Sequence, residues 1–545
     1  MPTACRFFIL ILFCLLALAA AQPQVVLGGT TVNGLSIPTF GQDFFGGISF
    51  AEPPIGALRF APPVLRLNPG VEALNATQFG AACPQTGALF DSSSEDCLTV
   101  NVLRPAGVNE SVALPVMVWV FGGGFMTGSA STYNGSEIVL QSVLRGTPII
   151  YVNLNYRLGP LGFPQGVEAE RRGATNLGNK DVIAALTWVQ NNIGAFGGDK
   201  EKVTVFGVSS GSIIIAQLLL NQTFDLARAA ILESGSAATN TLLHASDRED
   251  IWQDFVSAVP ECSNASRGKT FTCLRSASVE SLLNATNFTL GRAQMLFPFS
   301  PVIDSPGGII PDLPSLLFRR GKFSRIPMIT GTNLDEGTGF IPATFNSSTL
   351  LRQWLFTNTT PSPVSSFEQN FVIDGILKLY PNNPALGSPF GTGNETFGLD
   401  PAFKQASAVF ADIAFNSLRR KLAQDVSQHG TKVFAYLFTD PQTLTTAPYL
   451  GVTHGAEVVY VYGAPQNGPA SISLSRSMID YWVSFATSLD PNDGRGNASR
   501  SRWTQYTSKS ESILELNAEN LRMIPDSFRA VQINFLNEHP ETLLH

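Results

Sequence analysis

Charged side chains are scarce in this sequence. Asp, Glu, Lys and Arg make up 14% of its 545 residues, and 35 basic residues stand against 42 acidic ones, for a formal net charge of -7. A protein that binds nucleic acid needs clustered Lys and Arg to neutralise phosphates. We therefore expect no nucleic acid partner. The hydrophobic fraction of 44% is, by contrast, sufficient for a large buried core.

Long apolar runs are missing beyond the N-terminus. Near its start the chain has Arg6 followed by an apolar run, 7–21, that ends in three alanines, which is the layout of a cleavable secretory signal. That run is too short to span a bilayer, and no later stretch reaches the roughly 18 consecutive apolar residues that a span needs. We predict a signal peptide at 1–21, a secreted, extracellular mature chain at 22–545, and no stable membrane insertion.

Cysteine is rare as well. Two of the six cysteines lie within the predicted signal peptide, which leaves Cys83, Cys97, Cys262 and Cys273. Their separations do not match the two-residue spacing of zinc ligands, and an oxidising compartment favours disulfides. The short separations favour two local disulfides, although four cysteines allow three pairings. No metal ion and no organic cofactor is expected.

Asn-x-Ser/Thr sequons, the acceptors of N-linked glycans, are frequent. The chain has eleven of them, whereas its composition would give roughly five by chance. We predict a glycoprotein in which some of these surface positions are occupied. The sequons begin at Asn75, Asn109, Asn134, Asn221, Asn264, Asn284, Asn287, Asn346, Asn358, Asn394 and Asn497.

Short apolar runs alternate with segments of helical periodicity, and no repeat interrupts them. This alternation is typical of α/β proteins, and nearly continuous apolar runs fit strands that are covered on both faces. We predict one domain, 22–545, with a large, mostly parallel central sheet flanked by helices on both faces. The polar stretch 357–401 is interpreted as an excursion within this domain and not as a linker between domains. Helical spacing covers 181–192 and 477–489, and the strand candidates are 98–103, 116–121, 149–154, 203–206, 229–232, 326–329 and 433–438.

A short apolar run, a Gly-x-Ser-x-Gly turn and a second apolar run follow one another in 203–216. This order of strand, turn and helix is the context of a nucleophile elbow, in which flanking glycines let a serine stand clear of the backbone. The following helix directs its N-terminal amides toward developing negative charge. Ser209 is therefore the candidate nucleophile, although the five-residue motif alone is a weak signal.

A wider pattern strengthens this interpretation. Phe196-Gly-Gly, four further residues and Val203-Thr-Val-Phe-Gly-Val-Ser-Ser-Gly resemble the whole active-serine pattern of type-B carboxylesterases, the family that includes cholinesterases and fungal extracellular lipases. Glu95-Asp-Cys-Leu-Thr-Val-Asn-Val resembles a second pattern of the family. Further similarity runs from Gly46 to the region of His454, so it covers nearly all of the mature chain. The resemblance implies an α/β-hydrolase fold and serine esterase activity.

The resemblance also implies scaffold contacts. Two local disulfides and two buried ion pairs are expected, namely Cys83–Cys97, Cys262–Cys273, Arg59–Glu95 and Arg157–Asp181. The first disulfide encloses only thirteen residues, whereas lipases of this family hold a longer flap there. An active site that is open in water, with little interfacial activation, is therefore expected.

The apolar run 116–121 ends in three glycines, Gly122 to Gly124. An acyl-transfer intermediate carries a negative oxygen that preorganised backbone amides must stabilise, and glycine lets the backbone approach a substrate closely. By resemblance, the amides of Gly123 and Gly124 form the oxyanion hole together with that of Ser210. A flexible glycine turn is the alternative.

Histidine, the side chain whose pKa suits a general base near neutrality, occurs only five times. Four of these residues lie in polar segments, beside a turn or in the terminal tail: His244, His429, His539 and His545. His454 lies in Gly451-Val-Thr-His-Gly-Ala-Glu, which closely resembles the catalytic histidine loop of the family. The resemblance therefore assigns His454 as the general base.

An acidic residue must hold the imidazole in its working tautomer. Thr330-Gly-Thr-Asn-Leu-Asp-Glu-Gly follows a strand candidate and resembles the acidic loop of the family, in which the acid precedes glycine. That position is Glu336, with Asp335 as the next alternative and Asp304 as a weaker one. The chain order of serine, acid and histidine fits this fold and differs from trypsin-like and subtilisin-like proteases.

These features predict a secreted serine carboxylesterase that acts through an acyl-enzyme on neutral, apolar esters, either small molecules or lipids. The alternatives are a true lipase or sterol esterase acting on insoluble lipid, and a catalytically silent adhesion-type homologue. Many relatives carry glutamate before the nucleophile and alanine after it, whereas this chain has Val208 and Ser210, so a preference for cationic substrates is not expected. The Phe-rich segments 295–300 and 339–342 either line a substrate pocket or pack in the core.

Overall fold

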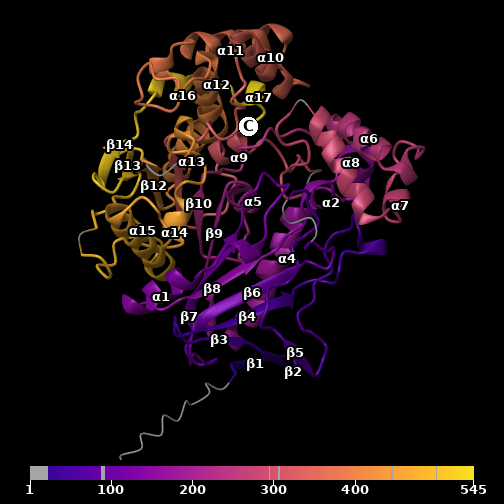
Figure 1. Cartoon of the computed structure of the whole chain (residues 1–545), viewed down its shortest axis with the longest axis vertical. Helices are drawn as coiled ribbons and strands as arrows, with labels where there is room; N and C mark the ends of the chain where they lie inside the picture. Colours follow the sequence, from indigo (N-terminus) through magenta and orange to yellow (C-terminus); the bar gives the residue numbers. More distant parts are fainter. Residues whose placement is uncertain (1–21, 88–91, 294, 305–306, 443–445, 499) are drawn as a thin grey trace, which may run out of the picture.

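A computed structural model describes residues 22–87, 92–293, 295–304, 307–442, 446–498 and 500–545. The predicted signal peptide, 1–21, lies outside the described residues. Within them, eleven strands form a central sheet in the order β14-β13-β12-β11-β10-β9-β7-β8-β6-β4-β3 (Figure 1). Neighbouring strands run parallel from β8 across to β13 and antiparallel at both ends of the sheet.

All seven predicted strands are present, and their burial explains their composition. Every residue of β8, β10, β11 and β12 is buried, so these strands need apolar side chains on both faces. The central strands are β6 (Thr99–Pro105), β7 (Leu114–Val120), β8 (Ile150–Leu154), β9 (Gly198–Val208), β10 (Ala229–Glu233), β11 (Met328–Asn333) and β12 (Val433–Phe438).

The outer strands were not predicted. They comprise β3 (Leu35–Ile37), β4 (Gln42–Ser49), β13 (Ser512–Leu516) and β14 (Arg522–Pro525). Strands β3 and β14 are short and contain no buried residue. Strand β4 is largely buried, but its polar residues and two glycines interrupt the apolar run that would mark it in the sequence. A separate three-stranded sheet contains β1 (Gln24–Leu27), β2 (Thr30–Asn33) and β5 (Ala73–Asn75).

Two sets of helices flank the central sheet, as predicted. Helices α1 (Ser136–Leu144) and α15 (Pro469–Ser488) contact each other and the strands β6 to β9. Helices α4 (Leu177–Asn192) and α5 (Ser210–Leu218) also contact each other and pack on β9, while α13 (Ser417–Gln428) packs on β11 and β12. In Figure 1, α1 and α15 lie to the left of the strands and α4 lies to the right.

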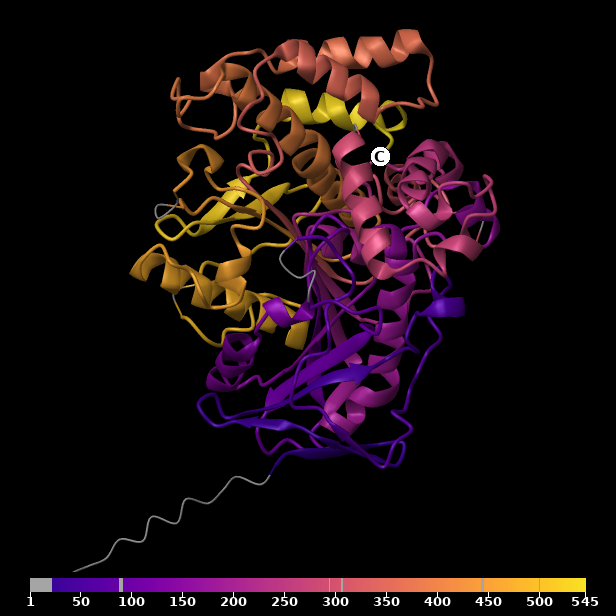
Figure 2. The same cartoon turned by 45° about the vertical axis from the view of Figure 1, so that its right-hand side comes forward.

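Further helices gather beyond the sheet. One group includes α10 (Ser348–Asn358), α11 (Ser366–Leu379), α12 (Pro401–Ala411) and α16 (Ala530–Glu538), which lie together at the top of Figure 2. Helix α11 therefore falls inside the polar stretch 357–401. A second group contains α6 (Glu249–Ala258), α7 (Phe271–Leu274) and α8 (Val279–Arg292). No helix among the described residues is long and apolar enough to cross a membrane.

Short helices complete the described chain. A π-helical turn, η7 (Asp412–Asn416), joins α12 to α13. The remaining α-helices are α2 (Gly159–Gly162), α3 (Gly166–Arg171), α9 (Pro314–Arg319), α14 (Val458–Val461) and α17 (Pro540–Leu543).

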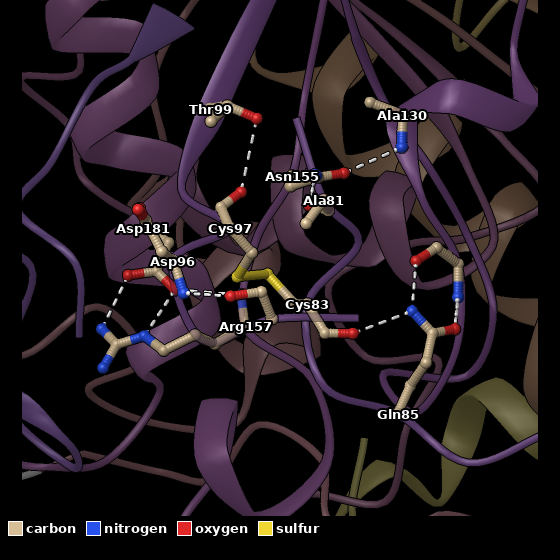
Figure 3. Close-up of a disulfide and its surroundings, with 12 residues drawn as sticks. Ala81, Cys83, Gln85, Asp96, Cys97, Thr99, Ala130, Asn155, Arg157 and Asp181 are labelled. Carbon is tan, nitrogen blue, oxygen red and sulfur yellow. Dashed lines mark hydrogen bonds and ion pairs between the residues drawn. A yellow bond between two sulfur atoms is a disulfide. The ribbon is translucent and has the colours of Figure 1, made fainter. Parts of the chain in front are cut away.

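The expected disulfides and ion pairs are formed. Cys83 is bonded to Cys97, close to the ion pair between Arg157 and Asp181 (Figure 3). That pair is almost fully buried, with a shortest distance of 2.7 Å between guanidinium and carboxylate. The other two contacts are the disulfide Cys262–Cys273 and the ion pair Arg59–Glu95 at 2.6 Å.

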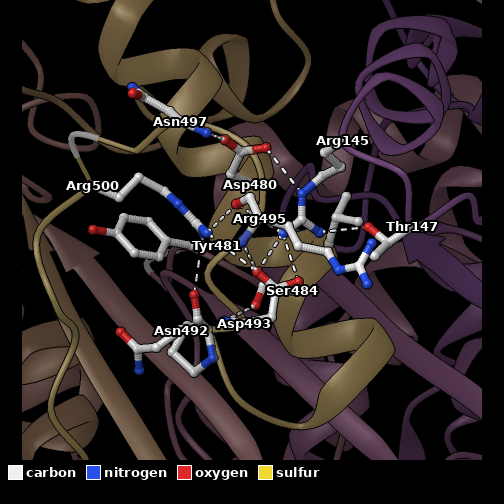
Figure 4. Close-up of polar contacts among 12 residues, drawn as sticks. Arg145, Thr147, Asp480, Tyr481, Ser484, Asn492, Asp493, Arg495, Asn497 and Arg500 are labelled. Atoms are coloured by element: carbon white, nitrogen blue, oxygen red, sulfur yellow. Dashed lines mark hydrogen bonds and ion pairs between the residues drawn. The ribbon is translucent and has the colours of Figure 1, made fainter.

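A charged network joins α1 to α15. The guanidinium of Arg145, at the end of α1, lies 3.2 Å from Asp480 of α15 and 2.7 Å from Asp493 (Figure 4). Arg500 lies 3.3 Å from Oδ1 of Asp493, the same oxygen that Arg145 contacts. Because these side chains are largely buried, removal of one partner would leave an uncompensated charge. The network therefore ties the two helices of this face together.

Candidate active site

Ser209 lies between β9 and α5, at the carboxyl end of the parallel strands. Its backbone has φ 55° and ψ -128°, a combination that residues other than glycine rarely adopt. The Ser209 amide donates a hydrogen bond to the carbonyl of Glu233 at the end of β10, with a distance of 2.9 Å. The predicted order of strand, turn and helix is confirmed, and the serine occupies the strained position of a nucleophile elbow.

The glycines on either side of Ser209 allow close packing against β7. A Cβ atom on Gly207 would lie 2.4 Å from the carbonyl oxygen of Val120, and one on Gly211 would lie 2.1 Å from the same oxygen. A side chain at either position would force α5 away from β7. From the sequence, we attributed these glycines to the need to expose the serine hydroxyl. The structure adds a second reason, which is the close packing of this turn against β7.

The three-glycine loop follows β7 and lies against the serine. A Cβ atom on Gly122 would lie 2.8 Å from Cβ of Ser209. Gly123 and Gly124 have φ angles of 122° and 62°, which glycine adopts without a steric penalty. Their amides donate no hydrogen bond to a described residue, and the amide of Ser210, the first residue of α5, has no acceptor within its helix. Three backbone donors are thus open beside Ser209.

His454 and Glu336 form a hydrogen-bonded pair. Nδ1 of His454 lies 2.5 Å from Oε2 of Glu336. The Glu336 side chain is fully buried, whereas that of His454 is 15% exposed. The second oxygen of Glu336, Oε1, accepts hydrogen bonds from the Ser234 hydroxyl at 2.6 Å and from the backbone amide of Asn333 at 2.7 Å. The carboxylate is therefore held in place, and it orients the imidazole through Nδ1.

The other ring nitrogen of His454 is open. Nε2 is buried and has no hydrogen-bond partner among the described residues. The rings of Phe340 and Phe415 pack against the imidazole at centroid distances of 5.0 and 4.7 Å. Nε2 accepts no hydrogen bond from the Ser209 hydroxyl in this structure. Catalytic hydrogen bonds are often long before substrate binds and tighten in the complex.

Sheet topology brings the three candidate residues to one edge. Strands β9, β10 and β11 are adjacent and parallel, so their carboxyl ends lie together. Ser209 follows β9, and Glu336 lies three residues beyond β11. A β-bridge between Asp335 and Thr453 attaches the loop that carries His454 to the same region. Clefts at the carboxyl ends of parallel strands are the usual binding sites of open α/β sheets.

The two alternative acids have other partners. Asp335 points into the scaffold, where its carboxylate accepts hydrogen bonds from the hydroxyl of Ser388 and the amides of Phe390 and Val452, at 2.8 to 2.9 Å. Asp304 binds the hydroxyl of Thr175 and the amides of Ile309 and Ile310. Neither of them contacts His454, so both carboxylates serve the local structure.

Two buried residues, Ser234 and Asn333, join Glu336 to a second carboxylate, that of Glu457. The sequence analysis assigned none of these three residues, and each has no exposed surface. Nδ2 of Asn333 lies 2.5 Å from Oε2 of Glu457, and the Ser234 hydroxyl lies 3.3 Å from Oε1. The only signal for Glu457 in the sequence was its place three residues after His454 in the same loop.

These carboxylates control the charge of the site. Burial alone would lower the pKa of His454, but the charge and hydrogen bond of Glu336 and the charge of Glu457 outweigh it and raise this pKa above 6.5. Burial, reinforced by the Glu336 charge, raises the pKa of Glu457 to about 7. Glu233, at the end of β10, has a pKa well above 4.5 because it is buried and faces the Glu457 charge.

Replacement of Glu457 by Gln should shift the pH dependence of ester hydrolysis downward. A histidine base acts in its neutral form, so kcat/KM rises as the pH increases through the histidine pKa. The Glu457 charge raises that pKa, and its removal should move the rising limb to lower pH. Measurement of kcat/KM across the neutral range, with wild type and Glu457→Gln side by side, tests this shift.

Glu233→Gln is a matched control for this experiment. Glu233 is also a fully buried glutamate near the site, but its charge is not among the causes that shift the His454 pKa. The control should keep the rising limb in its wild-type position. An unchanged or higher midpoint in Glu457→Gln would show that Glu457 has no electrostatic effect on the base.

The fold and the site together define a class of protein. A mostly parallel sheet carries a serine on the turn after β9, an acid after β11 and a histidine after β12. This order of elements and residues is that of the α/β-hydrolase fold.

Comparisons with known proteins narrow the class. The profile of the carboxylesterase family matches residues 21–536. Lipase 4 of Diutina rugosa is 35% identical, and the match covers 98% of this chain and 99% of the relative. Secreted lipase 1 of Botryotinia fuckeliana (strain B05.10) is 33% identical over 95% of this chain and 93% of the relative.

A solved structure is also similar to this chain over nearly its whole length. The crystal structure of Aspergillus niger EstA has a TM-score of 0.83 to this chain at 26% identity, covering 96% of this chain and 99% of its own. The protein therefore belongs to the carboxylesterase family and is a carboxylic ester hydrolase. The family, fold class and enzyme class predicted from the sequence are confirmed.

Proposed function

We propose that this enzyme hydrolyses carboxylic esters through an acyl-enzyme, with Ser209 as nucleophile, His454 as general base and Glu336 as the orienting acid. The observation that carries the proposal is the buried pair of His454 and Glu336. The unpaired Nε2 of His454 lies at the same edge of the sheet as the strained Ser209. Residues 22–545 act as one catalytic domain in this proposal.

The reaction proceeds in two halves. Oγ of Ser209 attacks the ester carbonyl carbon while Nε2 of His454 accepts the hydroxyl proton. The tetrahedral intermediate collapses, the carbon–oxygen bond to the alcohol breaks, and the imidazolium returns the proton to the leaving alkoxide. Water then attacks the acyl-serine with the same base, which releases the carboxylic acid. Glu336 stays ionised and stabilises the imidazolium through Nδ1.

Backbone amides stabilise the oxyanion in both halves. The open donors of Gly123, Gly124 and Ser210 are positioned beside Ser209 without a reorganisation of the loop. Such preorganised donors are effective because the negative charge develops where water is excluded, and one donor contributes about 10²- to 10³-fold in kcat. The glycine conformations described above make this arrangement possible.

The surroundings of the base favour neutral, apolar substrates. Besides Phe340 and Phe415, the ring of Phe297 borders the site, since a Cβ atom on Gly124 would lie 2.8 Å from it. Phe297 and Phe410 also line a cavity of about 60 Å³, whose lining includes neither Ser209 nor His454. In this proposal the Phe-rich segments form the wall of the substrate pocket.

Secretion has three supports. The Botryotinia relative is named a secreted lipase, the chain carries two disulfides, and most sequon asparagines are exposed. Disulfides form in oxidising compartments. We include an extracellular location in the proposal on these grounds, with the signal peptide at 1–21.

A chain-length series tests the substrate class. We expect p-nitrophenyl esters of short acids to be hydrolysed with higher kcat/KM than long-chain esters, with no jump in rate when the ester exceeds its solubility. Long-chain triglyceride or sterol esters that turn over faster, with a sharp increase in the presence of micelles, would instead identify a lipase or sterol esterase. Failure to label Ser209 with a fluorophosphonate would indicate a catalytically silent homologue.

A further inference from the structure

A cavity of about 300 Å³ lies outside the proposed catalytic site, between strands β3, β4, β6 and β8 and the segment that leads into α1. Its volume is at the lower end of the range for small-molecule pockets, so it accommodates one small ring rather than a long chain. Its apolar wall consists of Leu35, Phe44, Phe79, Leu103, Tyr133 and Tyr151.

The two buried asparagines of this cavity, Asn101 and Asn153, are already paired. Nδ2 of Asn101 donates to Oδ1 of Asn153 at 2.9 Å, and Oδ1 of Asn101 accepts from the Gly47 amide at 2.9 Å. Nδ2 of Asn153 donates to the carbonyl of Ala130 at 2.9 Å. An occupant is therefore not needed to satisfy buried donors or acceptors, and it gains its contacts by packing against the rings.

Apolar surface remains uncovered at the mouth. Phe79 is 38% exposed and Leu35 is 42% exposed, and both line the cavity. The ring of Phe79 packs on that of Phe44 at a centroid distance of 4.8 Å, so it has a defined orientation. A clustered set of exposed apolar side chains around a hollow indicates a surface that something covers.

A sequon asparagine lines the same cavity. Asn134 is exposed and begins the sequon Asn-Gly-Ser. Its Oδ1 accepts a hydrogen bond from the amide of Ser136 at 3.0 Å, and its Nδ2 donates to no described residue. Nδ2 is the atom to which an N-linked glycan is attached. The possible attachment point is thus part of the cavity wall.

The backbone holds Asn134 in this place. Gly135 packs on the ring of Tyr151, since a Cβ atom on it would lie 2.6 Å from that ring. Ser136 begins α1, and its carbonyl accepts a hydrogen bond from Nε2 of Gln42 at 2.8 Å. A sugar on Asn134 therefore starts from a fixed position next to the aromatic wall.

Two other sequons lack this combination. Asn358 is only half exposed, and its Nδ2 donates to the carbonyl of Trp354 at 2.9 Å. Asn109 is exposed in the turn between β6 and β7 and does not line this cavity. Asn109 is consequently a suitable reference for a glycan that projects into solvent.

We propose that Asn134 carries an N-linked glycan whose first N-acetylglucosamine occupies this aromatic cavity. The C–H faces of the sugar ring pack on Phe79 and Tyr133, while its hydroxyls and the rest of the glycan face solvent. In the transfer, the host enzyme joins Nδ2 to C1 of a lipid diphosphate oligosaccharide, which releases the lipid diphosphate and one Nδ2 proton. The inference rests on the proposed secretion but not on the catalytic assignments.

Native deglycosylation tests the proposal. The protein is secreted from an N-glycosylating eukaryotic host, and peptide mass spectrometry measures occupancy at Asn134 and Asn109. We expect Asn134 to be occupied and peptide-N-glycosidase to release its glycan at least tenfold more slowly than that of Asn109 in the folded protein, with equal rates after denaturation. Phe79→Ala should speed release at Asn134 and leave Asn109 unchanged.

Two variants add an independent readout. Asn134→Gln should lower the melting temperature, because the cavity loses its occupant, whereas Asn109→Gln should not. Both variants should keep the wild-type kcat/KM for a short ester. The catalytic proposal is tested by the activity of the wild-type protein, so its failure would be distinguished from a failure of the glycan proposal. An unoccupied Asn134 in secreted protein, or equal native release rates at the two sites, would overturn the inference. A chain that is never secreted would overturn it together with the proposed location.

Discussion

Ser209→Ala should lower kcat for a p-nitrophenyl ester by about 10⁴- to 10⁶-fold. The substitution removes the atom that forms the acyl bond, and in serine hydrolases only binding and oxyanion stabilisation remain once the nucleophile is lost. The serine is held in a strained conformation beside three open backbone donors, and alanine leaves those donors in place without a nucleophile. Steady-state kinetics on the purified variant measure the loss.

A nearby serine provides the matched control. Ser212 lies in α5, the helix that follows Ser209, and its buried hydroxyl donates to the carbonyl of Gly235 at 2.8 Å. Ser212→Ala therefore tests removal of a buried hydroxyl that is not the proposed nucleophile. This control should retain kcat within about tenfold and should still react with a fluorophosphonate. Wild-type activity or fluorophosphonate labelling in Ser209→Ala would show that another residue is the nucleophile.

Glu336→Gln should lower kcat by about 10³- to 10⁴-fold with little change in KM. Glutamine has nearly the same shape, but it cannot stabilise the imidazolium charge, and its amide can hold the ring in the wrong tautomer. Because Nδ1 of His454 contacts this carboxylate at 2.5 Å, the loss appears in the chemical step rather than in substrate binding. Measurement of kcat and KM separately distinguishes these two effects.

Asp335→Asn is the control for the loss of a buried carboxylate. Asp335 directly precedes Glu336 in the chain and is also buried, but its hydrogen bonds run to Ser388 and to backbone amides. We expect Asp335→Asn to lower the melting temperature and to retain most of the wild-type kcat. A larger loss of kcat in Asp335→Asn than in Glu336→Gln would mean that the acid had been assigned to the wrong residue.

Strands that are buried on both faces could be predicted from the sequence, because burial demands apolar residues at every position. Strand β12, for example, coincides with its predicted range, 433–438. Strand β14 and helix α11 were missed. The first is a partly exposed edge strand, and the second has only four buried residues in a segment rich in polar ones. Their stability depends on neighbours that a linear pattern does not contain.

Sequence motifs identified the candidate site residues, whereas the residues that contact them could be identified only from the folded structure. Gly-x-Ser-x-Gly and the histidine and acid loops directed attention to Ser209, His454 and Glu336, and the structure pairs the latter two. Ser234 lies outside these motifs, and Asn333 lies within the acid loop but had no assigned role, because a hydroxyl or amide can fill many roles. They matter here only because they lie between two buried carboxylates.

The sequence by itself determined the family, the fold class and the identity of the candidate nucleophile, because local turn geometry and continuous burial restrict the residues at each position. Only the tertiary structure decided that Glu336 rather than Asp335 faces His454, that Glu457 shares its environment, and that Asn134 borders an aromatic cavity. The side chains of adjacent residues point in different directions, and the residues that pack around each side chain determine where it points.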